Sequence, residues 1–372
     1  MRIALFIASL GTGGAERVTC IMANYWVGHG HEVHLVTLSW DGAEPAYPLD
    51  PLVRLDSFGA GGPSHGLLNK VRSNVSRLAG VRAAIRRIEP DVVISHVDST
   101  NVLVALACVG LGIKPFLVEH IHPPMHDIGP VWGTLRSFSY GLARKVVVLT
   151  EATRQHFRST LGDDKIAVIP NPVVEADSSS QAEVVKSYPR VLLCAGRLVR
   201  QKGFDIMLDT FARIAPDFPD WGLVILGEGP ERVALETQTA SLGLTDRVQM
   251  PGVVDNPFYS YGADIFVMPS RYEGFPMALC EAMAAGLPAV SFDCPTGPAD
   301  IVRTEVDGIL VPPERGEELA HALSRMMSDP LLRKALSAKS VEVAGRFSVE
   351  RVMGVWEQLI HGGSAPEESV HG

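Results

Sequence analysis

Two glutamates, Glu273 and Glu281, stand eight positions apart in the segment SRYEGFPMALCEAMAAGLPAV, which is otherwise mostly apolar or small. A β-branched apolar run ends near Ser270, and Pro276 is typical of the first turn of a helix. We therefore expect Glu273 in a loop and Glu281 within the helix, separated by about 80° around its axis. Because a carboxylate accepts two hydrogen bonds, such a pair suits the vicinal hydroxyls of a ribose or a hexose. A carboxylate that only stabilises the helix dipole would account for Glu273 but not for Glu281.

Two cations flank a predicted strand-to-helix turn in CAGRLVRQKGFD. Arg197 comes just after the strand and Lys202 just before the helix, an arrangement that suits a diphosphate. The alternative is an ordinary surface pair, although neither residue lies on an amphipathic helix face that would explain it.

A glycine-rich turn, LGTGGAER, follows the first predicted strand and opens a helix. Gly11, Gly13 and Gly14 would let backbone N–H groups approach a phosphate, or would only permit a tight turn. A dinucleotide fingerprint, G-x-G-x-x-G, requires glycine where this chain has Glu16, so the pattern argues against a nicotinamide dehydrogenase.

The elements that must position these residues alternate between short apolar strands and helices. The strand-like runs in the first half are RIALFIA, EVHLVTL, DVVISH, PFLVEH, KVVVLT and KIAVIP, and those in the second are RVLLCAG, GLVILGEG, RVQMPG, ADIFVMPS, LPAVSFD and GILVPP. This alternation predicts two parallel α/β sheets, with ligands beyond the carboxyl ends of the strands. We expect a first domain at 1–170, a serine-rich linker at 171–189, a second domain at 190–345, a helix at 346–361 that packs back on the first domain, and a disordered tail at 362–372.

Composition narrows the protein class. The 372 residues contain five cysteines, scattered singly, which argues against a disulfide framework or a zinc site and favours a reducing cytoplasm. The apolar start MRIALFIASL is short and lacks a cleavage motif, so we interpret it as a buried strand and not as a signal peptide. No apolar run reaches the roughly 18 residues that a membrane span needs.

The charge is uneven along the chain. Residues 1–170 hold 16 Lys and Arg against 14 Asp and Glu, and the remainder holds 17 against 28. Much of the positive charge lies in LLNKVRSNVSRLAGVRAAIRR, an amphipathic pattern without acidic residues whose predicted apolar face includes Val75. Its cations are Lys70, Arg72, Arg77, Arg82, Arg86 and Arg87. This helix is either a solvated cover for the sheet or a contact to an anionic membrane surface or acceptor; nucleic acid is disfavoured by the acidic total charge and the absence of interleaved aromatic residues.

Four motifs together resemble one enzyme family. The E-x7-E of Glu273 and Glu281, GRLVRQKG, GTGGAER and VEH look like the retaining, nucleotide-sugar-dependent glycosyltransferases of family 4, and the resemblance extends to about Leu359. It implies the GT-B fold: α/β, with two Rossmann-like domains whose parallel sheets face each other across an interdomain cleft. HVDSTN and DCPTGPADIV look most like bacterial members that extend lipid-linked oligosaccharides or polysaccharide repeat units, often from UDP-hexoses or UDP-N-acetylhexosamines.

The resemblance assigns roles to residues of this chain. Arg197 and Lys202 would neutralise the departing nucleoside diphosphate, which Gly13 and Gly14 would also approach, and Glu281 would hold the ribose. Glu273 would bind the transferred sugar, assisted by the backbone of Gly274, Phe275, Pro276 and Met277, with Val253 beside the base. His120 would face the reacting centre; His122 and His126 are rival candidates. His120, Glu273, Arg197 and Lys202 are thus the expected catalytic residues.

The acceptor side is less defined. Glu16, Asp98 and Asn101 are expected to contact the acceptor, with Ser99 nearby. Lys70, Arg77, Arg86 and Arg87 would contact a membrane or a lipid diphosphate if the basic helix has that role. We then expect a cytoplasmic protein, peripheral on the inner face of the membrane in that case, whose partners are a nucleotide-sugar donor and a glycan or lipid-linked acceptor.

No D-x-D motif is present, so we expect neither a metal nor a cofactor, with fixed cations and a helix dipole stabilising the leaving group. Retention follows only from the resemblance, and the expected route is a same-face displacement in which the leaving phosphate takes the acceptor's proton. The alternatives are a GDP-mannose-dependent mannosyltransferase, a UDP-sugar epimerase of the same architecture, and a silent sugar-nucleotide-binding module.

Overall fold

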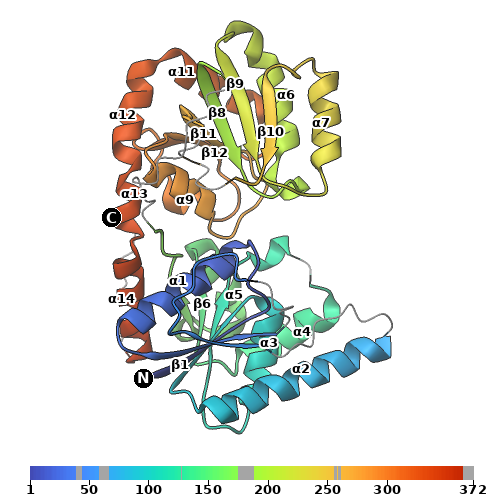
Figure 1. Cartoon of the computed structure of the whole chain (residues 1–372), viewed down its shortest axis with the longest axis vertical. Coiled ribbons are helices and arrows are strands. Elements are labelled where there is room, and N and C mark those ends of the chain that lie inside the picture. The colour runs from blue at the N-terminus through green and yellow to red at the C-terminus, as the bar shows by residue number, and fades with distance from the viewer. Residues whose placement is uncertain are drawn as a thin grey trace. The chain divides into compact units, whose positions relative to one another are not determined.

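The computed structural model describes residues 1–38, 44–57, 67–126, 128–174, 188–254, 258 and 261–362, and for residues 67–71 the backbone alone. The chain divides into two compact units (Figure 1). One comprises Met1–Pro172 and the last helix, α14 (Val349–Ile360), and the other comprises Val173–Ser348. Most of the predicted linker and nearly all of the predicted tail lie outside the described residues.

A seven-stranded parallel sheet forms the centre of the first unit, with the order β3-β2-β1-β4-β5-β6-β7. Its strands are β1 (Arg2–Ile7), β2 (Glu32–Thr37), β3 (Arg54–Ser57), β4 (Val92–His96), β5 (Phe116–Glu119), β6 (Lys145–Val148) and β7 (Ile166–Val168). Six of them are the predicted apolar runs, since parallel strands covered on both faces exclude most polar side chains. The edge strand β3, with the sequence RLDS, is not a continuous apolar run. Its four residues are partly or fully exposed, so polar side chains are tolerated there.

Helices cover both faces of this sheet. They are α1 (Gly14–Gly28), α2 (Leu67–Ile88), α3 (Asp98–Cys108), α4 (Pro130–Tyr140), α5 (Glu151–Leu161) and α14. On one face, Phe6 of β1 packs with Val81 of α2 and Val104 of α3.

The last helix of the chain packs against the first unit. Trp356 of α14 meets the edges of Trp26 of α1 and Phe116 of β5, with ring centroids 6.4 and 6.2 Å apart. Trp26 Nε1 also donates to Glu357 Oε1 at 2.6 Å. The chain therefore returns to complete the hydrophobic core of the unit in which it began.

The second unit has a six-stranded parallel sheet with the order β10-β9-β8-β11-β12-β13. Its strands are β8 (Arg190–Ala195), β9 (Trp221–Leu226), β10 (Val248–Gly252), β11 (Ile265–Met268), β12 (Ala289–Phe292) and β13 (Gly308–Val311). The helices are α6 (Phe204–Ile214), α7 (Arg232–Ser241), α9 (Met277–Ala284), α10 (Pro298–Ile301), α11 (Gly316–Ser328), α12 (Pro330–Ser340) and α13 (Glu342–Arg346). Phe211 of α6 and Leu323 of α11 belong to the same core cluster as Leu192 of β8.

Both sheets are doubly wound, which locates their ligand-binding ends. The strand order reverses between β1 and β4 in the first unit and between β8 and β11 in the second. Connections leave opposite faces of the sheet at such a point and open a crevice beyond the carboxyl ends of the strands. The loops that follow these four strands, together with the helices that these loops open, carry most of the predicted site residues.

Candidate active site

In the second unit, the loop after β8 is held against the loop after β11. A short 3₁₀ turn, Arg200–Lys202, leads to Gly203, whose φ of 67° is left-handed. A Cβ on Gly203 would overlap the carbonyl oxygen of Pro269, which follows β11, so only glycine permits this approach. The Arg271 amide donates to the Gln201 carbonyl at 2.8 Å, and the Gln201 side chain donates to the Tyr272 carbonyl at 2.8 Å.

This approach brings Lys202 to Glu273. Lys202 Nζ lies 2.6 Å from Glu273 Oε1, and the Ser270 hydroxyl donates to the same oxygen at 2.6 Å. The hydroxyl of Thr296, in the loop after β12, donates to the Glu273 backbone carbonyl. Glu273 is only 6% exposed, so loops from three neighbouring strands fix a buried carboxylate beside a partly buried ammonium group.

Two further charged residues, Arg271 and Asp205, hold the segment that carries Glu273. The Arg271 guanidinium donates to both oxygens of Asp205, on α6, at 2.8 and 2.7 Å, and Nε donates to Glu314 at 3.1 Å. Burial opposes ionisation of Asp205, but the hydrogen bonds and charge of Arg271 outweigh it and hold the pKa of that carboxyl below its ordinary value. The pair therefore ties the loop that carries Glu273 to the start of α6.

None of Ser270, Thr296, Arg271 and Asp205 was predicted as a site residue. Ser270 and Arg271 lie in the quoted segment, and Thr296 lies in the DCPTGPADIV motif, so proximity to a motif was the available signal. Nothing in their spacing indicates that Arg271 turns back to α6.

Glu281 lies inside α9, as the sequence predicts, and is 9% exposed. The N–H groups of Met277 and Ala278 stand in the first turn, where a helix leaves donors without intrahelical partners. Phe275 packs edge-on against Phe347, with centroids 5.2 Å apart, so its side chain belongs to the core and only its backbone could face a ligand. Arg197 and Val253 are exposed, the latter at 72%.

In the first unit, the β1–α1 turn is occupied by an acidic side chain. Gly13 caps α1, and a Cβ on Gly13 would overlap the Glu16 carboxylate. The Glu16 carboxylate thus lies beside the backbone of Gly13, which was expected, together with that of Gly14, to approach a phosphate. A ligand phosphate at Gly13 would have to displace this carboxylate.

Histidines gather at the carboxyl ends of β4 and β5. His96 ends β4 and is fully buried, whereas His120, directly after β5, is partly exposed. His96 Nδ1 lies 2.9 Å from His120 Nε2. His96 was not predicted as a site residue, although it belongs to the predicted strand DVVISH and stands two positions before Asp98.

The rival histidines are engaged elsewhere. His126 Nε2 lies 3.4 Å from Asp98 Oδ2, so it meets one of the predicted acceptor residues. His122 Nδ1 lies 3.2 Å from the Thr153 hydroxyl. Of the three candidates, His120 is the one for which the described residues show a contact with His96, the last residue of β4.

The structure corrects the expectation for Asn101. This residue is fully buried in α3, and its amide donates to the Val118 carbonyl at 2.8 Å and to the Tyr140 oxygen at 3.3 Å. The Tyr140 hydroxyl donates to Glu119 at 2.6 Å, and burial raises the pKa of Glu119 to about 7. Asn101 therefore organises the interior around β5 and does not face an acceptor.

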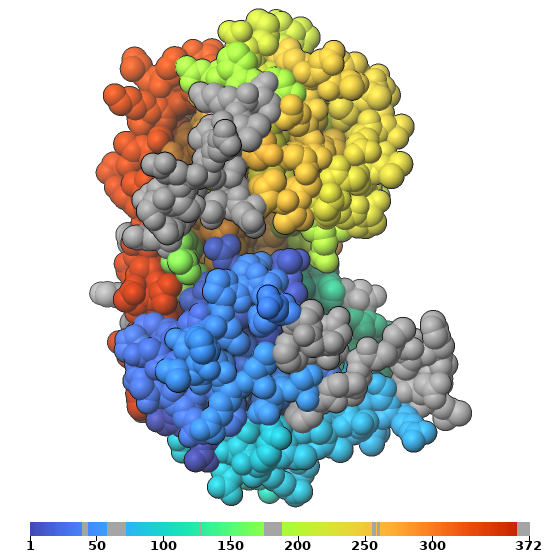
Figure 2. Space-filling view, in the orientation of Figure 1, coloured from blue at the N-terminus to red at the C-terminus, as the bar shows by residue number. Residues whose placement is uncertain are grey.

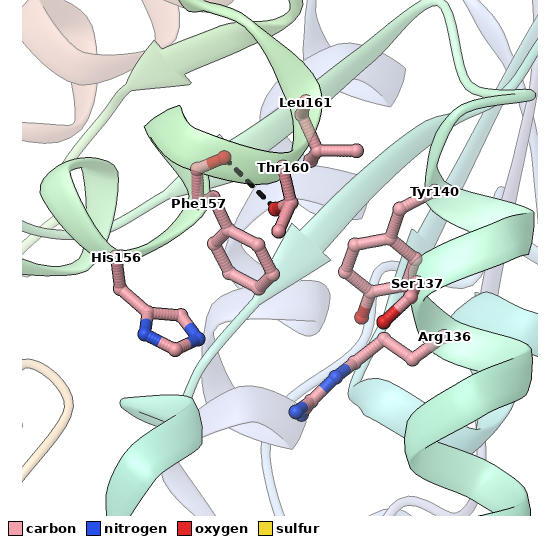
Figure 3. Close-up of a pocket in the computed structure, with 7 residues that line it drawn as sticks. All are labelled: Arg136, Ser137, Tyr140, His156, Phe157, Thr160 and Leu161. Carbon is pink, nitrogen blue, oxygen red and sulfur yellow. Dashed lines mark hydrogen bonds between the residues drawn. The ribbon is translucent and has the colours of Figure 1, made fainter.

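A small pocket lies between α4 and α5 (Figure 3). Its volume is about 60 Å³, and its lining includes Arg136, Tyr140, His156 and Phe157. In Figure 3 the α4 and α5 side chains face this space, and the Thr160 hydroxyl donates to the Phe157 carbonyl. Sites for small-molecule ligands usually occupy roughly 300–1,000 Å³, so this pocket is too small for a sugar nucleotide.

The predicted basic helix exists as α2, but one expectation requires correction: Val75, expected on the apolar face, is 60% exposed. Arg87 forms an ion pair with Asp56 of β3 at 2.8 Å, and its contact with a membrane or a lipid diphosphate stays a prediction. Figure 2 shows the light-blue to cyan part of the chain, which holds α2, open to solvent along one side of the first unit. Arg86 is exposed, whereas the side chain of Lys70 lies outside the described residues.

All five cysteines are buried and free. In the part of the chain that the structure describes, no group of three or more His, Cys, Asp or Glu side chains is arranged to hold a metal ion. No described helix combines the length and the apolar character needed to cross a bilayer.

The family follows from the sequence comparisons. A family described as Glycosyltransferase Family 4 matches residues 12–176, and one described as Glycosyl transferases group 1 matches residues 175–342. The chain belongs to glycosyltransferase family 4. Its two parallel-sheet units are the two Rossmann-like domains of the GT-B fold, as expected from the sequence.

Relatives cover nearly the whole length of this glycosyltransferase. It is 27% identical to the amylovoran biosynthesis glycosyltransferase AmsD of Erwinia amylovora, over 94% of this chain and 96% of the relative. It is also 27% identical, over 97% of this chain and 98% of the relative, to a Campylobacter jejuni enzyme named GalNAc-alpha-(1->4)-GalNAc-alpha-(1->3)-diNAcBac-PP-undecaprenol alpha-1,4-N-acetyl-D-galactosaminyltransferase. The solved structure of Anabaena Alr3699/HepE in complex with UDP and glucose matches its fold with a TM-score of 0.77 at 20% identity, over 97% of this chain and 99% of that one.

Proposed function

We propose that this glycosyltransferase moves a hexose or N-acetylhexosamine from a UDP-sugar to a hydroxyl of a glycan acceptor, with retention of configuration and without a metal ion. The observation that supports this most directly is the fixed pair of Lys202 and Glu273 at the point where the second sheet reverses its strand order. A cation and a buried carboxylate stand together at the end of the sheet where doubly wound folds bind their ligands.

The donor would bind to the second unit. Lys202, joined by the exposed Arg197, would meet the diphosphate, and the first-turn N–H groups of α9 would add to the positive potential. Glu273 would accept hydrogen bonds from the transferred sugar, and Glu281 from the ribose, with Val253 near the base. Because Ser270 and Thr296 hold the Glu273 segment by separate bonds, Lys202 could exchange Glu273 for phosphate oxygens without releasing that segment.

The chemical step exchanges one bond for another. The bond from the anomeric carbon to the diphosphate oxygen breaks as the bond to the acceptor oxygen forms on the same face, and the acceptor's proton passes to the leaving phosphate. The two cations would stabilise the negative charge that develops on the diphosphate, the usual role of fixed electrostatic groups in such transfers. No glycosyl-enzyme intermediate is formed along this route.

The acceptor would be a lipid-linked glycan or a polysaccharide repeat unit. The name of the Campylobacter relative specifies a glycan carried on undecaprenyl diphosphate, and that of the Erwinia relative specifies the biosynthesis of amylovoran. Asp98 and Glu16 remain the proposed acceptor contacts in the first unit. Arg77 and Arg86 of α2 would contact the anionic membrane surface or the lipid diphosphate, so we place the enzyme at the cytoplasmic face.

Release of UDP from a panel of UDP- and GDP-hexoses and N-acetylhexosamines tests the proposal. The assay would contain lipid-linked acceptor extract and would compare the wild type with Lys202→Ala, Glu273→Ala and the exposed-site control Lys334→Ala. Release from one UDP-sugar that the first two changes abolish and the control retains would support the proposal. Interconversion of a sugar without nucleotide release would instead indicate an epimerase, and release of GDP alone would indicate the mannosyltransferase alternative.

A further inference from the structure

Two adjacent strands of the first sheet end in histidines that touch. His96 is the last residue of β4, which pairs in parallel with β5, and His120 directly follows β5. Their nitrogens, His96 Nδ1 and His120 Nε2, are 2.9 Å apart, and the ring centroids are separated by 5.2 Å with the planes tilted by 33°. This is hydrogen-bond geometry, and it requires one proton between the two nitrogens.

Neither ring is expected to be charged near neutral pH. Burial lowers the pKa of His96 well below its ordinary value, with a smaller effect from His120, and burial lowers the pKa of His120 to about 4. Each neutral imidazole carries its proton on one nitrogen only. Either His96 donates from Nδ1 to His120, or His120 donates from Nε2 to His96.

The other nitrogen of His96 distinguishes these two arrangements. His96 Nε2 is buried and has no hydrogen-bond partner among the described residues. If His120 were the donor, that Nε2 would carry a proton with nowhere to donate it, and an orphaned buried N–H is the rarer and costlier defect. If His96 donates from Nδ1, Nε2 is only an unused acceptor.

Donation from His96 Nδ1 determines which nitrogen of His120 carries the proton. With Nε2 accepting from His96, the proton of His120 resides on Nδ1. His120 is partly exposed, and no described residue forms a hydrogen bond with its Nδ1. The ring therefore directs one N–H donor away from His96 and toward any ligand that reaches the end of β5.

The surrounding chain holds both rings in place. Val97, next to His96, has φ 72° and ψ 140°, a conformation that β-branched residues rarely adopt, and its amide donates to the Val118 carbonyl at 3.2 Å. On the other side, Glu119 accepts from the Tyr140 hydroxyl and from the Ile121 amide, so the backbone is fixed both before and after His120.

We propose that His96 is a positioning residue, which sets the tautomer of His120 so that His120 presents an Nδ1–H donor to a substrate oxygen instead of acting as a base. The hydrogen bond from His120 to a sugar nucleotide rests on the proposed function; the tautomer of the pair does not. This arrangement also leaves the proton of the acceptor to the departing phosphate, because His120 has no free basic nitrogen facing outward.

Long-range ¹H–¹⁵N correlation spectra of the full-length protein labelled with [¹⁵N]histidine test the tautomer directly. The expected result is a protonated Nδ1 and an unprotonated Nε2 on His96, with its signals assigned by their loss in His96→Asn. A protonated Nε2 on His96, or a charged ring on either residue at pH 7, would overturn the proposal whether or not transfer activity has been found.

A matched set of variants then tests the consequence for turnover. His96→Asn can keep an N–H donor near the position of Nδ1, whereas His96→Leu removes it. We expect about threefold or smaller loss of kcat for the asparagine variant and on the order of 10- to 100-fold loss for leucine, with unchanged affinity for the nucleoside diphosphate. His156→Asn, at an exposed position of α5, serves as the control. Equal activity of the asparagine and leucine variants, with both folded by circular dichroism, would refute the positioning role.

Discussion

Lys202 and Glu273 form an ion pair, with 2.6 Å between Nζ and Oε1, that joins the loop after β8 to the loop after β11. The pair links two residues to which the family resemblance assigns different parts of the donor, the diphosphate and the sugar. Each compensates the charge of the other, and the Ser270 hydroxyl donates to the same carboxylate oxygen. Their separate contributions to stability and to turnover can be measured by changing one, the other, or both.

Replacing Lys202 by methionine should destabilise the second unit, because it leaves the Glu273 carboxylate buried without its cation. We expect a loss of about 1–3 kcal/mol in the free energy of unfolding. Lys202→Met combined with Glu273→Gln should recover most of that stability, since the buried charge is removed as well, while transfer activity stays abolished. Urea unfolding and UDP release on all three variants would check this. Full activity of the double variant would contradict the assigned roles.

Arg271→Lys should impair turnover without removing any proposed substrate contact. Lysine keeps the charge but cannot reproduce the two parallel bonds to Asp205, so the segment that carries Glu273 loses its anchor on α6. We expect about a tenfold fall in kcat/KM for the donor. Steady-state kinetics on Arg271→Lys and Asp205→Asn would measure it, with Arg325→Lys, which interrupts a comparable exposed pair with Glu305, as the control. Equal kinetics in all three would show that the Arg271 anchor is dispensable.

Stability should fall with rising pH because of Glu119. Burial raises its pKa from the ordinary 4.5 to about 7, so the folded state binds a proton that the unfolded chain has already lost between those values. The contribution is fully present below about pH 4.5 and is lost as pH rises through 7, with a total on the order of 1–3 kcal/mol. Denaturant unfolding of wild type and Glu119→Gln at pH 5.5 and 8 should show a shallower pH dependence in the variant. Parallel curves would exclude this carboxyl as the source.

Changing Arg77 and Arg86 to glutamate should reduce sedimentation with anionic phospholipid vesicles. Each basic residue near such a surface contributes about 1 kcal/mol of attraction. Arg213→Glu/Arg315→Glu makes the same charge change at exposed positions of the second unit and should bind like wild type. If both double variants lose binding equally, net charge explains the result and the α2 helix has no specific role.

Chelation should leave the rate of transfer unchanged. Fixed cations at the second sheet would do the work that a divalent ion does elsewhere, so we expect equal UDP release with and without EDTA. An EDTA-sensitive rate that Mg²⁺ or Mn²⁺ restores would disprove metal independence.

The fold was largely predictable because buried parallel strands can be recognised in the sequence as continuous apolar runs, as in Ile3–Ile7 and Leu223–Leu226. The family and the fold were confirmed by the comparisons, whereas the individual site roles stay predictions. β3 was missed because an edge strand tolerates Arg54 and Asp56.

The site was predicted less completely than the fold, for a physical reason. Charged residues such as Lys202 and Glu273 stand out in an apolar context, but the groups that orient them are local and ordinary. Ser270, Thr296 and His96 gain their roles only when separate strands end side by side, and the sequence does not show which strands are neighbours. The acceptor role predicted for Asn101 was wrong because a polar residue that follows a strand can also face the interior. Its amide donates to the Val118 carbonyl and to the Tyr140 oxygen.

The return of α14 to the first unit has a consequence for any attempt to divide the protein. The chain leaves the first unit after Pro172 and re-enters it at Val349, so a cut at the first crossing yields a fragment without Trp356. Trp26 and Phe116 would then expose aromatic surface to water, and such a fragment would be prone to aggregate. A circularly permuted chain in which residues 349–362 precede Met1 would keep each unit continuous in sequence.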